Sequence, residues 1–241
     1  MVLVSPRNPL NIGAATRAMA NFGFPHLTVV APYEPHWREA KSAVGAEELL
    51  QNARCTQSLA EAVADCTLVI GTGTLTHRKS EQPVVSLPDL APLLESKGAH
   101  GARVALVFGP EKHGLTREDL SWCQLLVEIP TDAHQPSMNL GQAVAVCLYE
   151  LASSAARAGN GQPLSDEAIP AAPSASLDLL AGVIEQTMAA AGYSPRAMQP
   201  ANRHDLRLLL RRLAPSARDT RRMLGLFRRI LWTLKPDRKR K

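Results

Sequence analysis

The sequence predicts an α/β fold built on a parallel sheet and followed by a small all-α extension. Apolar runs such as Val104–Phe108 are continuous rather than alternating, which is typical of strands covered on both faces. Helical periodicities lie between these runs from residue 1 to about 155. Beyond residue 176 only helical patterns remain. A stretch rich in Gly, Pro, Ala and Ser, residues 156–175, separates the two parts and predicts a linker.

The first part, residues 1–155, is expected to form one domain of alternating strands and helices. Apolar runs predict strands over 2–4, 27–30, 67–71, 104–108 and 125–129. Helical spacing of apolar residues predicts helices over 12–22, 87–94, 116–122 and 139–153, with a mixed helix-and-loop stretch up to about 64. The last helix has the clearest pattern, because Leu140, Val144, Cys147 and Leu148 fall on one face.

The second part, residues 176–241, is expected to hold three helices. They cover 177–191, 204–213 and 219–234, and Gly192, Pro215 and Pro236 follow their ends. In the second helix, leucines 206, 209, 210 and 213 predict the buried stripe, which leaves Arg207 and Arg211 on another face. In the third helix, the expected exposed arginines are Arg221, Arg222, Arg228 and Arg229.

Charge is unevenly distributed along the chain. Residues 1–195 carry 12 Lys+Arg and 19 Asp+Glu, whereas residues 196–241 carry 15 and 3. Such a basic segment is typical of proteins that bind a polyanion, and we expect a nucleic acid rather than a membrane surface. A solvated helical face with a basic tail is the plainer alternative. Because guanidinium groups suit bidentate contacts with phosphate, the expected RNA-binding residues of the extension are its six arginines named above.

Several other classes of protein are disfavoured. No apolar run approaches the roughly 20 residues of a spanning helix, and the N-terminus lacks the pattern of a signal peptide. The four cysteines lie far apart, with no CxxC pair and no histidine at metal-ligand spacing. This pattern predicts reduced thiols and no metal site, in a cytoplasmic protein.

Three loops of the first domain are candidates for a ligand site. The segment from Ile129 to Leu140 leads from a strand into an amphipathic helix, and Ser137 and Asn139 are capping-type residues ahead of that helix. The other two loops, 71–74 and 108–115, also follow strands. Loops at the carboxyl ends of parallel strands converge on one crevice, so the sequence predicts a small-molecule site there.

The composition of these loops does not identify the ligand. The Gly-Thr-Gly-Thr loop at 71–74 lacks the third glycine of the dinucleotide fingerprint, and the chain has no GxxxxGK[ST] motif. These absences argue against a dinucleotide-dependent oxidoreductase and against a Walker nucleotide site. The alternative that the 71–74 loop is a simple tight turn remains. Gly109 permits close approach of a ligand to the backbone. Glu111 could act as a general base or accept hydrogen bonds within the loop, and we favour the second role.

Taken together, three segments resemble the motifs of a known family. They are Asn11-Ile-Gly-Ala-Ala-Thr-Arg-Ala-Met19, Ala105-Leu-Val-Phe-Gly-Pro-Glu-Lys-His-Gly-Leu115, and Ile129-Pro with Ser137-Met-Asn-Leu140. In this order they resemble the three motifs of the SPOUT (SpoU/TrmH-type) RNA 2′-O-ribose methyltransferases, over residues 2 to about 153. The first motif and the helical extension are most similar to the TrmJ-like tRNA branch.

The resemblance implies a fold, a cofactor and an assembly. The domain would carry a deep C-terminal trefoil knot, a feature that is nearly absent from other folds. S-adenosylmethionine would bind in the knot, largely through backbone groups, and the active site would form across a homodimer. By position, the implied cofactor-binding residues are Thr72, Gly73, Thr74, Gly109, Glu111, Ile129, Pro136, Ser137 and Met138.

The resemblance also implies catalytic residues, of which Arg17 is the main one. It would reach the cofactor of the other subunit. Because a guanidinium stays protonated in proteins, we expect Arg17 to stabilise the developing alkoxide and hold a phosphate rather than act as a base. Asn11 and Asn139 would orient the loops or the ribose, and Ser137 would bond the ribose or the cofactor.

The chain departs from the family pattern at several positions, which puts substrate contacts more in doubt than cofactor binding. Arg78 is the expected counterpart of an arginine-rich run, Pro110 stands where arginine is common, and Pro136 and Met138 replace Ser and Leu. The implied substrate is tRNA, methylated at the cytidine or uridine at position 32 of the anticodon loop. The same chemistry on ribosomal RNA or another tRNA site, and a non-catalytic knotted RNA-binding protein, are the alternatives.

Overall fold

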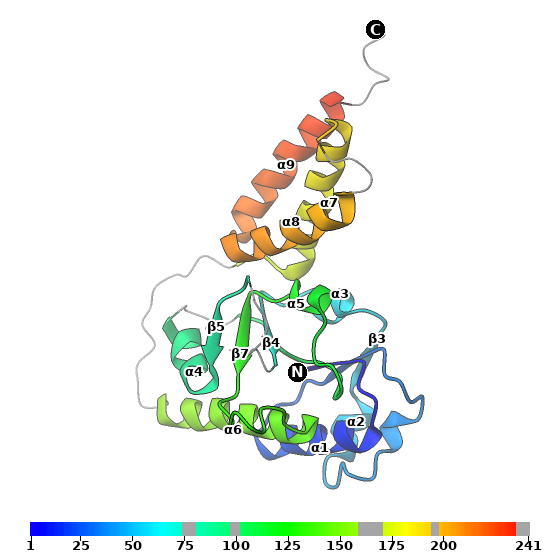
Figure 1. Cartoon of the computed structure of the whole chain (residues 1–241), viewed down its shortest axis with the longest axis vertical. Coiled ribbons are helices and arrows are strands. Elements are labelled where there is room, and N and C mark those ends of the chain that lie inside the picture. Colours follow the sequence, from blue (N-terminus) through cyan, green and yellow to red (C-terminus); the bar gives the residue numbers. More distant parts are fainter. Residues whose placement is uncertain (74–80, 97–101, 159–170, 194–197, 235–241) are drawn as a thin grey trace.

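The computed structural model describes residues 1–73, 81–96, 102–158, 171–193 and 198–234, which form an α/β domain with a helical extension at one end (Figure 1). The sheet has seven strands in the order β3-β2-β1-β6-β4-β7-β5, and every pairing is parallel. The strands are β1 (Val2–Val4), β2 (Thr28–Val30), β3 (Arg54–Thr56), β4 (Leu68–Thr72), β5 (Val84–Ser86), β6 (Val104–Phe108) and β7 (Leu125–Glu128).

Helices cover both faces of the sheet, which explains why its central strands are continuously apolar. One face packs against the helices α1 (Pro9–Asn21), α2 (Glu47–Gln51), α4 (Leu87–Ser96) and α6 (Leu140–Ala158) and the short η1 (Trp37–Glu39). The other face packs against α3 (Leu59–Ala62) and the segment around α5 (Arg117–Leu120). Side chains alternate between the two cores along each strand, so that Leu3 faces the first core and Val2 and Val4 face the second.

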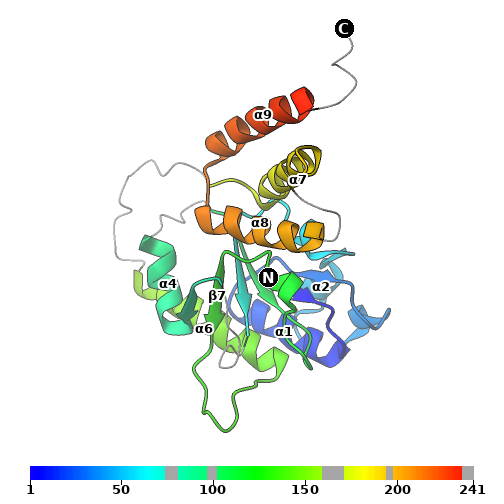
Figure 2. The same cartoon turned by 45° about the horizontal axis from the view of Figure 1, so that its top comes forward.

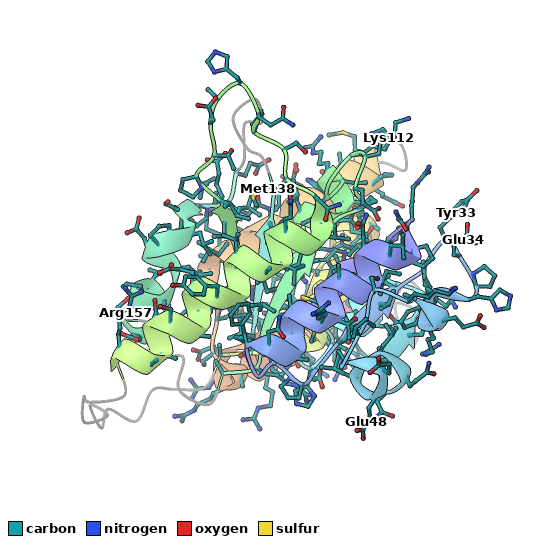
Figure 3. All side chains as sticks on the ribbon, turned by 90° about the horizontal axis from the view of Figure 1, so that it is seen from below. Tyr33, Glu34, Glu48, Lys112, Met138 and Arg157 are labelled. Carbon is teal, nitrogen blue, oxygen red and sulfur yellow. The ribbon has the colours of Figure 1, made fainter. Side chains whose placement is uncertain are left out.

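The two longest helices of the domain, α1 and α6, lie side by side (Figures 1 and 3). Gly141 of α6 makes this packing possible, because a Cβ there would lie 2.8 Å from the Cβ of Ala14. The N-terminus of α1 is capped by the side chain of Asn8, which accepts from the Leu10 N–H, with Pro9 in the first turn. Both helix N-termini lie beside the carboxyl ends of strands, where the expected site residues are.

The extension consists of α7 (Ser174–Ala190), α8 (Gln199–Leu213) and α9 (Ala217–Leu234). They share a small core of Leu180, Ala181, Val183, Leu210 and Leu224. The backbone of the extension is tied to the domain, because Ser174 N–H donates to Cys66 O at 2.8 Å and Ala175 N–H donates to Ala64 O at 2.9 Å. In Figure 2, α8 lies nearest the α/β domain and α9 farthest from it.

The expected burial pattern of α8 is wrong in part, although Leu210 is buried and Leu206 packs against the core of the extension as expected. Leu209 and Leu213 are exposed, whereas Arg207 and Arg211 are buried. The reason is that this face of α8 meets Trp122 of the domain, and both guanidinium groups lie over the indole ring, at 4.2 and 4.8 Å. The described helices otherwise follow the expected ranges, whereas the short edge strands β3 and β5 are additions. Most of the expected linker, residues 159–170, lies outside the described residues.

Candidate active site

The three loops expected to converge do meet, around a cavity of about 300 Å³. Gly73 and the end of β4 form one wall, the segment from Phe108 to Leu115 forms another, and residues from Ile129 to Met138 form the third. The N-terminal turn of α6 contributes Leu140 and Ala143. The lining combines apolar side chains with glycine backbone and hydroxyl groups, as small-molecule sites commonly do.

The loop after β6 is folded tightly on itself, and Gly109 makes this possible. A Cβ at Gly109 would lie 2.3 Å from backbone atoms of Gly114 and Leu115. Gly114 has a φ of +63°, and its N–H donates to Pro110 O at 2.9 Å. The turn thus keeps the backbone of 109–114 against the cavity. Gly73 differs, because nothing lies within 4 Å of a Cβ built there, so its backbone borders open space.

Glu111 joins this loop to the segment that precedes α1. Its carboxylate accepts hydrogen bonds from Arg7 N–H at 3.0 Å, Asn8 N–H at 3.1 Å and Asn11 Nδ2 at 2.9 Å. Burial alone would raise the pKa of Glu111, but these donors outweigh burial and lower the pKa below its ordinary value of 4.5. Glu111 is therefore ionised at neutral pH and makes the structural contacts we favoured over a general-base role.

The hydrogen bonds continue from Glu111 to the N-terminus of α6. Asn139 Nδ2 donates to Asn11 Oδ1 at 2.9 Å, and Asn139 Oδ1 accepts from Gly141 N–H at 2.9 Å. The chain Glu111–Asn11–Asn139 thus links the three motif segments through side chains that lie at least 100 residues apart in sequence. It fixes the orientation of both amides and caps α6. Ser137 and Met138 line the cavity directly before this cap, and Figure 3 places Met138 at this end of α6.

Arg17 does not line the cavity of its own chain. It is exposed on α1 and forms no hydrogen bond or ion pair with any residue that the structure describes. It lies about two helical turns along α1 from the exposed Leu10. Two other expected residues, Thr74 and Arg78, fall in 74–80, outside the described residues.

The cavity also has lining residues that were not among the predicted site residues, although Pro110 was noted as a departure from the family pattern. They are Pro110, Lys112 and His113 in the 109–115 turn, and Thr131, whose hydroxyl donates to Pro136 O at 3.3 Å. Asn8 was missed as well, although an asparagine directly before a proline is a common helix start and could have been recognised. Thr131 had no comparable signal, because its role depends on how the 129–138 loop folds back.

The expected RNA-binding arginines separate into two groups. Arg221, Arg222, Arg228 and Arg229 are exposed on α9, as expected. Arg207 and Arg211 are buried, and this part of the expectation is corrected. Arg211 donates to Trp122 O at 3.0 Å and to Ser174 Oγ at 3.1 Å, and Arg207 donates to Glu118 and Ser121. Their guanidinium groups attach α8 to the domain and leave no room for a phosphate.

Burial and the neighbouring Arg207 lower the pKa of Arg211 to about 10. Arg211 therefore stays charged at neutral pH. Within the described ranges there is no group of three or more His, Cys, Asp or Glu side chains that could hold a metal ion. Nor does any helix described there have the length and apolar character to cross a membrane.

Comparison with known proteins agrees with this geometry. Residues 1–149 match the model of the SpoU rRNA Methylase family. The tRNA (cytidine/uridine/adenosine-2′-O-)-methyltransferase TrmJ of Pseudomonas aeruginosa is 42% identical over 153 residues, which are 63% of this chain and 59% of that protein. The tRNA (cytidine/uridine-2′-O-)-methyltransferase TrmJ of Escherichia coli K12 is 33% identical over 241 residues, covering 99% of this chain and 96% of that protein.

A solved structure extends the likeness to the whole chain. The crystal structure of TrmJ from Z. mobilis ZM4 superposes with a TM-score of 0.80 at 31% identity, over 95% of this chain and 97% of that one. The match therefore includes the helical extension as well as the α/β domain.

Proposed function

This chain belongs to the SpoU methylase family, and from that membership we propose that it is a TrmJ-type tRNA 2′-O-ribose methyltransferase that uses S-adenosylmethionine. One observation carries the proposal: the hydrogen-bonded chain Glu111–Asn11–Asn139 draws the three motif segments together beside a single cavity. A protein that had lost the activity would have little need to keep this arrangement.

The residues of the cavity fit S-adenosylmethionine. The cavity volume of about 300 Å³ lies at the lower end of the range for small-molecule sites. Ile129, Met138 and Leu140 offer an apolar slot for an adenine ring, and the backbone at Gly73 and Gly109 offers polar groups at its edges. Thr72, Thr74, Pro136 and Ser137 complete the proposed cofactor-binding set, and Glu111 supports it by holding the 109–115 turn. When bound, the cofactor supplies an electrophilic methyl group.

Arg17 is the proposed catalytic residue. The substrate 2′-OH develops negative charge as it attacks a methyl carbon, and a guanidinium placed beside it stabilises that charge without giving up its own proton. It also holds a neighbouring phosphate of the RNA, which orients the ribose. Asn11 and Asn139 act as positioning residues, and Ser137 bonds the ribose or the cofactor.

A homodimer is part of the proposal, because Arg17 does not line the cavity of its own chain. The outer face of α1 and α6 around Arg17 exposes Leu10, Val146 and Tyr149, which are 55%, 37% and 58% exposed. Apolar side chains gathered in this way favour a protein partner. A second copy on this face would bring Arg17 to the other cavity, in a domain that we propose to carry the trefoil knot of the family.

The proposed substrate is the cytidine or uridine at position 32 of a tRNA anticodon loop, in the cytoplasm. The name of the Escherichia relative supports a pyrimidine of tRNA, whereas the name of the Pseudomonas relative adds adenosine to cytidine and uridine. The domain spans 1–155, and the extension from 176 onward, with the exposed arginines of α9, would bind the tRNA body. A different tRNA site or ribosomal RNA is the second candidate. The name of the matching family model favours ribosomal RNA.

Calorimetry combined with methyl-transfer kinetics tests the proposal. S-adenosylmethionine should bind the wild type, and NAD should not. Arg17→Ala should reduce methyl transfer to tRNA by at least about 100-fold, a loss typical of removing one stabilising donor, while its affinity for S-adenosylmethionine stays unchanged. Normal turnover by Arg17→Ala would remove Arg17 from the mechanism. Binding of NAD alone would contradict the proposed function itself.

A further inference from the structure

Two neighbouring loops at the carboxyl edge of the sheet have the same unusual construction. Strands β1 and β2 end in register, with Val4 opposite Val30, and each is followed by a non-glycine residue and a proline. Ser5 and Ala31, the residues before the prolines, have φ values of +44° and +41°. Both lie in the left-handed region, which is unfavourable for a residue with a Cβ and which residues before proline normally avoid. Strain repeated at equivalent places suggests a function.

The two turns bring Arg7 and Tyr33 together. Each of these residues directly follows one of the prolines, and Tyr33 N–H donates to Pro6 O at 3.1 Å, which joins the loops. The Arg7 guanidinium carbon lies 5.4 Å from the centre of the Tyr33 ring, within the range of a cation–π contact. The Tyr33 side chain remains 69% exposed. An aromatic ring this open, in a chain with only 4% aromatic residues, is available to a ligand.

The Arg7–Tyr33 pair lies next to the cavity. The backbone N–H groups of Arg7 and Asn8 donate to Glu111, which lines the cavity together with Lys112. Figure 3 shows Tyr33 and Lys112 on the same side of the molecule, near the N-terminal end of α1. If the methylated nucleotide lies over the cavity, the nucleotides adjacent to it in the RNA would therefore be within reach of Arg7 and Tyr33.

We propose that Tyr33 and Arg7 form a subsite for a nucleotide that flanks the methylated one, with its base stacked on Tyr33 and a phosphate paired with Arg7. This inference rests on the proposed function and adds a substrate contact to it. Bases of single-stranded loops stack on exposed aromatic rings, and arginine pairs with phosphate. Glu34, exposed beside Tyr33, would repel a long run of phosphates, so the surface suits one nucleotide rather than a backbone track.

Steady-state kinetics and equilibrium binding with full-length tRNA test the stacking contact. Tyr33→Ala should raise the KM for tRNA and the Kd for tRNA about tenfold, because losing one stacked base weakens binding on this order. The kcat and the KM for S-adenosylmethionine should change less than about twofold. Tyr33→Phe keeps the ring and should recover most of the lost affinity. An exposed side chain tolerates these changes, and thermal melting of each variant checks that it folds.

The salt dependence of tRNA binding distinguishes the phosphate contact of Arg7 from the stacking contact of Tyr33. Arg7→Ala should make the plot of log K against log salt shallower by about 0.7, the value for one phosphate contact in a single strand. Tyr33→Ala should weaken binding equally at every salt concentration. Arg157→Ala is the matched charge control, because Arg157 is an exposed arginine paired with Glu150 at the far end of α6 from Met138 (Figure 3). It should change neither the slope nor the KM.

Unchanged tRNA affinity in Tyr33→Ala, with an active wild type, would overturn the subsite and leave the proposed function intact. A shift of the monomer–dimer equilibrium by Tyr33→Ala, with tRNA affinity per dimer unchanged, would also overturn it and assign the pair to an interface between copies. A wild type that binds S-adenosylmethionine but transfers no methyl group to any RNA would contradict the proposed function instead.

Discussion

Glu111 is the residue on which the arrangement of the site depends most. Its carboxylate accepts three hydrogen bonds from the segment that starts α1, and one of these donors is the Asn11 side chain that contacts Asn139. A single side chain therefore holds the 109–115 turn against the segment that starts α1, and Asn11 extends this connection to Asn139. The family resemblance indicated that Glu111 belongs to the site, but its partners are about 100 residues away and only the folded chain identifies them.

Glu111→Gln should destabilise the protein by about 1–3 kcal/mol at pH 7, because an amide has one acceptor oxygen and cannot serve all three donors. The folded-state pKa of Glu111 is below 4.5, so the contribution of the carboxylate is complete above pH 4.5 and is lost as the pH falls toward the folded-state pKa. The stability difference between wild type and Glu111→Gln should therefore shrink below pH 4.5. Chemical denaturation at several pH values measures this.

Glu95→Gln, at an exposed position of α4, is the control and should follow the wild type at every pH. A stability difference between wild type and Glu111→Gln that stays constant down to pH 3 would mean that the carboxylate charge does not stabilise the fold.

At the scale of elements, the sequence predicts the interior of the domain better than its edges. Strands β4, β6 and β7 are recognisable because buried parallel strands are continuously apolar. Strands β3 and β5 have three residues each and lie at the two edges of the sheet, where Arg54, Cys55 and Val84 are exposed. Their pattern resembles that of a loop, and only pairing with a neighbouring strand makes them strands.

Helix α8 shows a different limit of sequence analysis. Its leucines and arginines both recur at helical spacing, and the assumption that leucine lies inside is correct for Leu210 but wrong for Leu209 and Leu213, and it missed the buried arginines. Trp122 determines that the arginine face of α8 is buried. Its ring attracts both guanidinium groups, and the neighbouring carbonyl and hydroxyl oxygens accept their hydrogen bonds. No property of α8 alone reveals a partner that lies 89 residues earlier in the chain.

Arg211→Ala should lower the free energy of unfolding by about 3 kcal/mol, because it removes a buried charged group and leaves Trp122 O and Ser174 Oγ without their donor. It should also make the junction between α8 and the domain more sensitive to limited proteolysis. Arg212→Ala changes the adjacent exposed arginine and should stay within about 0.5 kcal/mol of the wild type. Equal stability of the two variants would contradict the proposed attachment of α8.

At the scale of the whole molecule, the helical extension combines two roles. Buried arginines on α8 attach it to the domain, and exposed arginines on α9 leave a basic surface farther out (Figure 2). The charge asymmetry of the sequence predicted a basic surface, but not that two of its arginines are structural. The remaining four are the proposed contacts with the tRNA body.

Replacing Arg221, Arg222, Arg228 and Arg229 with Gln should weaken tRNA binding and reduce its salt dependence. Each lost phosphate contact should make the slope of log K against log salt shallower by about 0.7–0.9. Affinity for S-adenosylmethionine should not change, because α9 is remote from the cavity. A slope equal to that of the wild type would exclude α9 from the tRNA contacts.

The outer face of α1 and α6 is where the proposed dimer can be tested. Val146→Asp should convert the dimer to a monomer in sedimentation velocity, because it places a charge in an apolar interface. Methyl transfer should fall with it, since Arg17 is proposed to act on the partner's cavity. Leu179→Asp, an exposed position of α7, should leave the oligomeric state unchanged. A fully active Val146→Asp monomer would contradict an active site shared between subunits.

Arg17 and the cavity of the partner subunit are proposed to act together in the methylation of a tRNA ribose. The most direct measurement incubates the full-length protein with unmodified tRNA and S-adenosylmethionine and identifies the modified nucleoside by mass spectrometry, with its position mapped. We expect 2′-O-methylcytidine or 2′-O-methyluridine at position 32, and no product with Arg17→Ala. A methyl group on a base, or no methylated tRNA from a wild type that binds S-adenosylmethionine, would contradict the proposed function.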